Sequence, residues 1–262
     1  ADLRHAQEGS KLWKDPVGWL EHQRDTRLVS EFRFYREEIL RLRLALGIPD
    51  VFYTPDGCKY NGVFALLLML RRLAIPGPWN CIVHQFCLTY PRCSDLFNTM
   101  IDFIYRKHCH LLNDVRIFRP HFQSYADAVG ARCPLTGCVI FVDGHELPIA
   151  KPTLWKRVCY TGKSRRHCLK FQGATLANGM FAEFTGPEPG SINDSTMMGK
   201  SGFLQRMASC VNLVHGPDGP AGLYYGYGDP AYKRGAWLAG PHKGKCLTGD
   251  QRRFNVKMSR LR

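Results

Sequence analysis

The stretch CVIFVDG, residues 138–144, is the clearest guide to the fold of this chain. Its apolar run, residues 139–142, is typical of a strand that is covered on both faces of a sheet. Asp143 ends this run and is followed by a glycine. Because strands end at the rim of a sheet, where side chains from several strands converge, we expect Asp143 to lie at a functional edge.

More strand patterns follow this stretch. Residues 167–177 and 179–186 read as two strands, and Asn178-Gly179 between them is a strong hairpin signal. A helix is expected over residues 195–209, and the tyrosine-rich run 222–229 reads as a strand that also ends in an aspartate. A central strand, an antiparallel hairpin and a crossover back to another strand are the layout of a ribonuclease H-like domain. We therefore predict an α/β fold with a mixed sheet over residues 133–262.

The first half, residues 1–132, is predicted to be an all-α helical domain. Helices are expected over the ranges 31–46, 61–74, 81–86 and 94–112, with residues 53–58 as a turn-rich connection. Ser94 suits the N-cap of the last helix by residue type. The short third helix permits a helix-turn-helix reading, but no base-reading side chains can be picked out. A helical bundle is the preferred interpretation.

Charge indicates a polyanionic partner. The chain has 36 Lys and Arg against 22 Asp and Glu, a formal net charge of +14. Each phosphate that a basic side chain neutralises releases a condensed counterion, which favours binding to nucleic acid. The alternative is a basic but ordinary surface. We favour nucleic acid, because net charge bears on partners and not on fold.

Cysteine spacing and apolar runs bear on the class of protein. The 11 Cys include no CxxC pair, which argues against a zinc ribbon or finger. We expect reduced thiols in an intracellular protein. The longest apolar run, 63–70, is much shorter than the roughly twenty residues of a membrane span, so no membrane association is expected. The sequence starts without an apolar signal segment and without Met, which suggests that its numbering begins inside a longer protein.

Three aspartates are the candidate metal ligands. Asp143 and Asp229 each end a predicted strand, and oxygen ligands of this kind suit a hard divalent ion such as Mg²⁺. Two such ions support the displacement at a phosphodiester. The alternative for each residue is a turn former or a helix cap. This alternative is most open for Asp194, which precedes the predicted helix 195–209.

A family resemblance makes these positions specific. The segments that carry it occur in the family's order: FVDGHELPIAKP (141–152), YTGKSRRHCLKFQGATLANG (160–179), GPEPGSINDSTMM (186–198), GDPAYKRGAWLAGP (228–241) and QRRFNVKMSRLR (251–262). Together they resemble the PIF/Harbinger-type DDE transposases and their domesticated nuclease relatives. The helical first half is also similar to the region that precedes this domain in that family.

The resemblance implies roles for the three aspartates. Asp143 and Asp229 correspond to the first two catalytic carboxylates, and Asp194 to a further acidic position that binds metal or supports it. Three positions depart from the family pattern, namely His145, Asn193 and Lys233. The family's third catalytic residue is a Glu a few residues after Ser-x-x-Arg. That motif is residues 259–262 here, so we expect the Glu just past Arg262.

Two basic clusters are candidates for phosphate binding. The first follows Asp143 and consists of Lys156, Arg157, Lys163, Arg165, Arg166 and Lys170. The second is near the end of the sequence and consists of Arg252, Arg253, Lys257, Arg260 and Arg262. The alternative in each case is a solvated charged face. Trp155 and Tyr160 could stack on bases, but core packing is the preferred interpretation.

These readings predict a divalent-metal DNA endonuclease or transposase, with Mg²⁺ as cofactor and Mn²⁺ as its substitute. The resemblance further implies a nuclear protein that acts on DNA, a Myb/SANT-like DNA-binding partner and a homo-oligomer. The alternative function is a domesticated DNA- or protein-binding module in which cleavage is weak or lost. Absence of the third carboxylate would favour that alternative.

Overall fold

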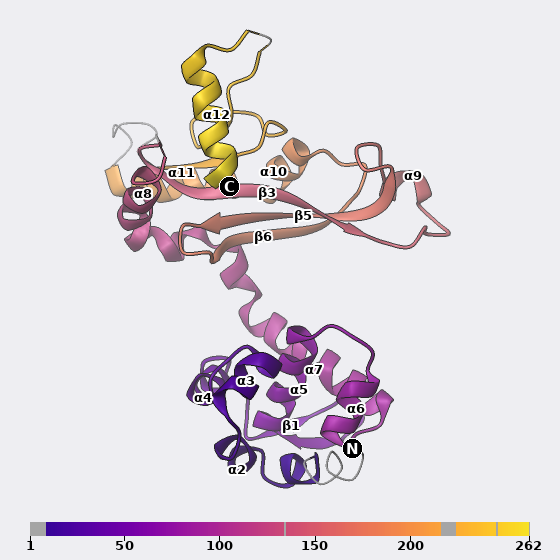
Figure 1. Ribbon diagram of the computed structural model, residues 1–262. Coiled ribbons are helices and arrows are strands. Elements are labelled where there is room, and N and C mark those ends of the chain that lie inside the picture. Colours follow the sequence, from indigo (N-terminus) through magenta and orange to yellow (C-terminus); the bar gives the residue numbers. More distant parts are fainter. Residues whose placement is uncertain (1–8, 134, 216–223, 245, 262) are drawn as a thin grey trace. The chain divides into compact units, whose positions relative to one another are not determined.

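The structure is a computed structural model that describes residues 9–133, 135–215, 224–244 and 246–261 (Figure 1). The chain divides into two compact units, Ala1–Cys109 and His110–Arg262. The boundary between the two halves was predicted between residues 132 and 133, whereas the two compact units meet between residues 109 and 110. Residues 110–132 fall in the second unit because Val115, Phe122 and Ala126 pack in the same apolar cluster as the central strand.

The first unit is mainly helical. Its labelled helices are α2 (Pro16–Glu21), α3 (Asp25–Phe32), α4 (Arg36–Ala45), α5 (Gly62–Ala74), α6 (Asn80–Phe86) and α7 (Tyr90–His108). It also contains an antiparallel pair of short strands, β1 (Val51–Tyr53) and β2 (Lys59–Asn61), so it is not all-α as predicted. This pair flanks the predicted turn 53–58, which is too short a segment for strand periodicity to be read from the sequence.

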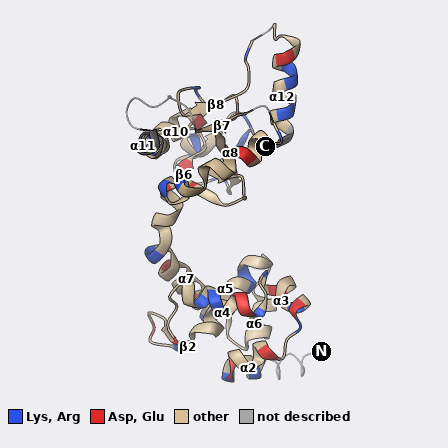
Figure 2. Cartoon of the chain, turned by 90° about the vertical axis from the view of Figure 1, so that its left-hand side faces the viewer, with Lys and Arg blue, Asp and Glu red and all other residues tan. Residues whose placement is uncertain are grey.

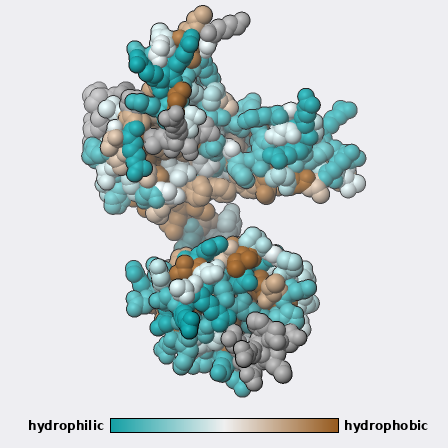
Figure 3. Space-filling model, in the orientation of Figure 1, coloured by the Kyte–Doolittle hydropathy of each residue, from teal (hydrophilic) through white to brown (hydrophobic). Residues whose placement is uncertain are grey.

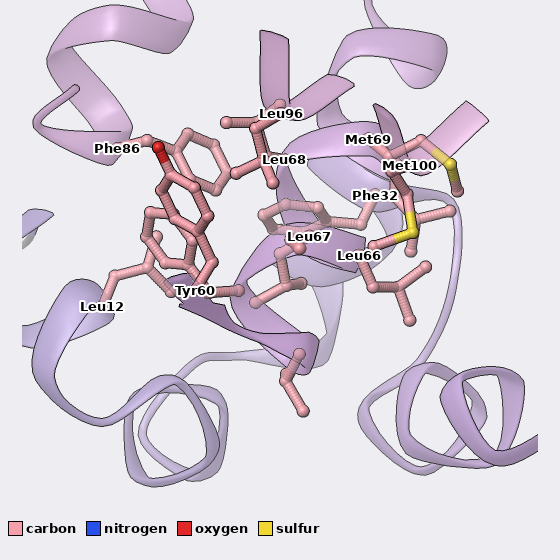
Figure 4. Packing of buried hydrophobic residues seen from close by; sticks show 14 of the residues in the cluster. Leu12, Phe32, Tyr60, Leu66, Leu67, Leu68, Met69, Phe86, Leu96 and Met100 are labelled. Carbon is pink, nitrogen blue, oxygen red and sulfur yellow. The ribbon is translucent and has the colours of Figure 1, made fainter. Parts of the chain in front are cut away.

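Helix α5 is the centre of the first unit. Every residue from Gly62 to Leu70 is buried, and Asn61 caps the helix by accepting a hydrogen bond from the Val63 amide at 2.9 Å. Figure 4 shows Leu66, Leu67 and other side chains of α5 packed against those of neighbouring elements. Burial all round this helix explains why its sequence is apolar on every face.

Two helix boundaries in this unit differ from prediction. The predicted helix 31–46 is two helices, because Arg33 adopts a left-handed conformation (φ 67°) that ends α3. Helix α7 starts at Tyr90 with Thr89 as its N-cap, and not at Ser94. Pro91 in the first turn favours this earlier start, because its fixed φ suits a helix and its missing N–H would be unbonded there in any case.

The second unit is a mixed sheet with helices around it. After the 3₁₀ helices η1 (Cys109–Asn113) and η2 (Val115–His121) and helix α8 (Phe122–Gly130), the strands are β3 (Cys138–Pro148), β4 (Tyr160–Thr161), β5 (Arg166–Leu176), β6 (Phe181–Pro189), β7 (Tyr225–Gly228) and β8 (Leu238–Ala239). The helices among and after them are α9 (Lys156–Cys159), α10 (Asp194–Ser201), α11 (Phe203–His215) and α12 (Gly249–Leu261).

The strand order is β4-β5-β3-β7-β8, with β6 also paired to β5. Strand β3 pairs antiparallel with β5 and parallel with β7, as the predicted crossover requires. The Asn178-Gly179 turn joins β5 to β6, and Gly179 has the positive φ (84°) that such a turn needs. The mixed α/β character predicted for this region is confirmed.

Helices lie on both faces of the sheet. On one face the rings of Phe141 and Tyr227 contact each other, and Tyr227 also contacts Phe254 of α12. On the other face, Val142 shares an apolar cluster with Met198 of α10. The predicted helix 195–209 is divided into α10 and α11, because Gly202 between them is left-handed (φ 70°). None of the described helices is long and apolar enough to cross a membrane.

Candidate functional site

Asp143 lies within β3, and Asp229 directly follows the neighbouring strand β7. The last residue pair between the parallel strands β3 and β7 is Val142 with Gly228. Asp143 follows Val142 and Asp229 follows Gly228. Adjacent strands are about 4.8 Å apart, which brings the two carboxylates within reach of a common ion. The prediction that Asp143 ends its strand is wrong. It ends the pairing with β7, while β3 continues to Pro148 along β5.

Both carboxylates belong to the face that α12 covers. Phe141 and Tyr227 precede them by two residues, and their rings are 6.4 Å apart on that face. Side chains two positions apart on a strand share a face, so Asp143 and Asp229 point to the same side as these rings. The crossover between β3 and β7 therefore produces a two-carboxylate site at one edge of the parallel pairing.

Each aspartate also bonds to the backbone beside it. Asp143 Oδ1 accepts from the Gly144 amide at 2.9 Å, and Asp229 Oδ1 accepts from the Ala231 amide at 2.8 Å. The turn role considered for Asp229 is thus real. It does not exclude metal binding, because an ionised carboxylate has about four acceptor positions. These bonds fix the carboxylates in place rather than saturate them.

Asp194 lies on the opposite face of the sheet. A Cβ on Gly144 would be 3.3 Å from the Asp194 carboxyl carbon, and this Cβ points away from the side chain of the preceding Asp143. The Asp194 carboxylate is 3.4 Å from the ammonium of Lys170, which also donates to the Ile192 carbonyl at 2.9 Å. Asp194 is therefore engaged with Lys170, on the face away from the catalytic candidates.

The capping role considered for Asp194 belongs to its neighbour. Asn193 is the N-cap of α10, and its side-chain oxygen accepts from the Thr196 amide at 2.7 Å. Asp194 is the first residue of the helix, where a negative charge interacts favourably with the helix dipole. Asn193 is thus a helix cap at the position where a His was expected from the family pattern.

The three predicted ligands do not form one cluster. Among the residues that the structure describes, no group of three or more His, Cys, Asp or Glu side chains is arranged to hold a metal ion. Two adjacent carboxylates still fit a hard divalent cation by donor type. The described part of the site supplies two candidate ligands of the same kind, Asp143 and Asp229.

The first basic cluster is divided by burial. Lys156, Arg157, Lys163, Arg165 and Arg166 are exposed around the loop between β3 and β5. Lys170 is only 8 % exposed and is bonded within the fold, so its position does not support the predicted phosphate contact. Arg166 lies 3.7 Å from Glu146, whose pKa is lowered chiefly by a hydrogen bond from Ser164 and further by nearby cations.

The second basic cluster lies on α12. Arg252 and Arg253 are exposed, and Arg253 lies 2.6 Å from Asp250. Figure 2 shows blue Lys and Arg segments along this helix. Because α12 packs on the same face as Asp143 and Asp229, its exposed cations lie on the side of the sheet that carries the carboxylate pair.

Two aromatic side chains are not where they were predicted. Trp155 is 74 % exposed and Tyr160 is 41 % exposed, so the core interpretation is wrong for Trp155 and does not fit Tyr160. Trp155 also has a positive φ of 62°. The structural role of Lys170 was also not predicted from the sequence. The signal for this role in the sequence is that Lys170 shares a strand face with the apolar residues Cys168, Ala174 and Leu176.

One comparison with known proteins found a match. Residues 142–262 match the model of a family described as DDE superfamily endonuclease. The matched range begins one residue before Asp143 and includes Asp194 and Asp229. A search of curated proteins and a search of solved structures each found no match. The match supports the DDE endonuclease superfamily for this region, and members of that superfamily act on DNA and generally use divalent metals.

Proposed function

We propose that the second unit is a divalent-metal DNA endonuclease or transposase of the PIF/Harbinger type, and that Asp143 and Asp229 are its catalytic carboxylates. The observation that carries the proposal is that each aspartate directly follows the last residue pair between the parallel strands β3 and β7. The sheet order, with an antiparallel hairpin on one side of β3 and parallel strands on the other, supports a ribonuclease H-like fold.

Asp143 and Asp229 would hold the metal, Mg²⁺ with Mn²⁺ as a substitute. The bound ion would supply activation of the attacking water or 3′-hydroxyl and stabilisation of the leaving oxygen. The chain's own contribution is to keep the two carboxylates oriented through the Gly144 and Ala231 amides. A further carboxylate is expected from the family pattern, a Glu beyond Arg262. Asp194 lies on the other face, where it is paired with Lys170.

DNA would bind along the basic side chains that flank this edge. Lys163 and Arg165 are exposed near the β3–β5 loop, and Arg252 is exposed on α12. Such contacts with phosphates fix the register of the duplex without reading its sequence. We further propose a nuclear location, a Myb/SANT-like partner for site selection and a homo-oligomeric assembly. These three proposals rest on the family resemblance.

A second candidate is a DNA-binding module that no longer cuts. The observation that favours it is the lack of a three-ligand group among the described residues. In that case the basic surface would still bind DNA, while the two aspartates alone would hold metal weakly.

The test is nicking of supercoiled plasmid by the full-length protein in Mg²⁺ or Mn²⁺. We expect metal-dependent nicking by the wild type and its loss in Asp143→Ala and in Asp229→Ala. Asp127→Ala is the matched control, because Asp127 is an exposed aspartate on α8. Nicking by Asp143→Ala at the wild-type rate would rule out this site. Full DNA binding without any nicking by the wild type would establish the second candidate.

A further inference from the structure

A long strand pair extends from the carboxylate pair and ends in an exposed loop. We call it the arm: β3 from Gly144 to Pro148, the tip at residues 149–165, and β5 from Arg166 to Gln172. Figure 1 shows β3 and β5 running together towards α9, which lies within the tip. Beyond Val142 the parallel partner β7 is no longer paired with β3, so the arm leaves the centre of the sheet.

The tip combines exposed apolar side chains with positive charge. Leu154 and Trp155 are 72 % and 74 % exposed. Residues 149–165 contain five Lys and Arg, which are Lys151, Lys156, Arg157, Lys163 and Arg165, and no Asp or Glu. Figure 3 shows the surface on the side of the arm as mostly hydrophilic. An indole that projects from a tip whose charged side chains are all cationic complements a ligand with both aromatic faces and negative charge.

The backbone at Trp155 is held in an unfavourable conformation. Its φ of 62° lies in the left-handed region, which a bulky residue rarely adopts. The Trp155 carbonyl accepts from the Cys159 amide at 3.0 Å, and the Val158 carbonyl accepts from the Ser191 amide at 3.0 Å. These bonds fix the tip while the indole points outward. A strained residue that the surrounding structure holds in place is a pointer to function.

From these observations we propose that the arm binds DNA beside the point of cutting and that Trp155 stacks on an unstacked base there. Lys156, Arg157 and Lys163 would contact phosphates. This inference rests on the proposed function, since it takes DNA as the ligand. A protruding indole cannot stack within intact base pairs unless a base step opens, so the preferred ligand is DNA with a gap or a single-stranded segment.

The length of the arm sets where this contact falls. Five residues separate Asp143 from Pro148 along β3, which corresponds to about 17 Å at the strand rise. Trp155 is twelve residues after Asp143, so the two Cα atoms are within roughly 40 Å of each other. The base contact therefore lies within about one helical turn of the cutting site.

The test is equilibrium binding in EDTA, where no cutting occurs, measured by fluorescence anisotropy. The probes are an intact duplex, the same duplex with a one-nucleotide gap, and a single strand, each about 20 nucleotides long and so longer than one binding site. We expect Trp155→Ala to weaken binding to gapped and single-stranded DNA about 5- to 100-fold, with a much smaller loss on intact duplex. Trp155→Phe should restore most of the affinity.

Two further variants separate stacking from charge. Arg157→Ala should weaken binding to all three probes alike and reduce the slope of log affinity against log salt by about 1, whereas Trp155→Ala should leave that slope unchanged. Tyr53→Ala is the control, because Tyr53 is 62 % exposed in the first unit. Thermal unfolding checks that each variant is folded.

The arm proposal is overturned if Trp155→Ala binds all three probes as the wild type does, or loses the same factor on each. In the first case the exposed indole serves another ligand, such as a protein. The proposed function is judged separately by plasmid nicking with Asp143→Ala. Binding that depends on Trp155 alongside nicking that ignores Asp143 would leave the arm inference standing and remove the active-site assignment.

Discussion

The ammonium of Lys170 lies 3.4 Å from the carboxylate of Asp194, on the face of the sheet opposite Asp143. Both side chains are largely withdrawn from water, with 10 % and 16 % of their surfaces exposed. A charge in such a place costs free energy unless it is paired and hydrogen bonded. The pair therefore explains Asp194 as part of the packing between β5 and α10, near the catalytic candidates but not among them.

Removing Asp194 should destabilise the second unit. Asp194→Ala would leave the Lys170 ammonium with the Ile192 carbonyl, and we expect a loss of about 1–3 kcal/mol in the free energy of unfolding. Urea denaturation measures it. The double variant Lys170→Met with Asp194→Leu should recover much of this loss, since apolar replacement of a buried ion pair is often neutral. An Asp194→Ala protein of wild-type stability that fails to nick DNA would contradict this assignment.

Two glycines near the end of α10 should respond oppositely to alanine. Gly202 has a φ of 70°, and a Cβ there would be 3.1 Å from the Arg206 guanidinium, so Gly202→Ala should destabilise by about 1 kcal/mol or more. Gly199 lies inside α10 with open space around its Cβ position, so Gly199→Ala should stabilise by about 0.5–1 kcal/mol. Thermal unfolding of both variants compares them directly. Equal shifts would show that Gly202 is not required between α10 and α11.

The sequence predicted those features that depend on local pattern. The apolar run 139–142 and the Asn178-Gly179 turn identify β3 and the β5–β6 hairpin. The crossover implied by the order of elements brings Asp143 and Asp229 to the same edge. Each of these inferences needs only periodicity, turn chemistry and the parallel pairing of two strands, all of which can be read along the chain.

Two kinds of feature could not be predicted in this way. One is which face of the sheet a helix covers, and the other is which residues adopt a left-handed backbone conformation. Asp194 is close to Asp143 in the fold, but whether it joins the carboxylate pair depends on which face α10 covers. The breaks at Arg33 and Gly202 come from left-handed residues, and one of these is not a glycine. Trp155 reads as a core residue by type, and only the long β3–β5 arm makes it project outward.

The buried carboxyl of Glu183, which is paired with Arg206, should make the free energy of unfolding depend on pH. Burial raises the pKa of the Glu183 carboxyl above its ordinary value of 4.5, although the hydrogen bond from Arg206 opposes this shift. A carboxyl whose pKa is raised in the folded state binds its proton more tightly there. Protonation of Glu183 therefore stabilises the folded protein. This stabilisation is fully present below about pH 4.5 and is lost as the pH rises through the pKa of Glu183 in the folded state.

The variant Glu183→Gln removes this titration while keeping an oxygen for Arg206. We expect its free energy of unfolding to rise relative to that of the wild type as the pH increases from about 4.5 to neutrality. Urea denaturation across this range measures the difference. Glu188→Gln is the comparison variant. Glu188 forms an ion pair with Lys200 at 2.9 Å, and both of these side chains are more exposed than that of Glu183. If the difference in free energy of unfolding between Glu183→Gln and the wild type does not change with pH, burial does not raise the pKa of Glu183.

Metal binding should depend on the two aspartates of one face and not on the third. Mn²⁺ bound to the protein lowers the electron paramagnetic resonance signal of the free ion, so titration gives the affinity. We expect Asp143→Asn and Asp229→Asn each to weaken Mn²⁺ binding by more than about tenfold, since even residues that only support a metal ligand change affinity by 10–100-fold. Asp194→Asn keeps an oxygen for Lys170 and should change the affinity far less. If Asp194→Asn weakens Mn²⁺ binding as much as Asp143→Asn does, the carboxylates of both faces act on one ion, and the separation of Asp194 from the pair is wrong.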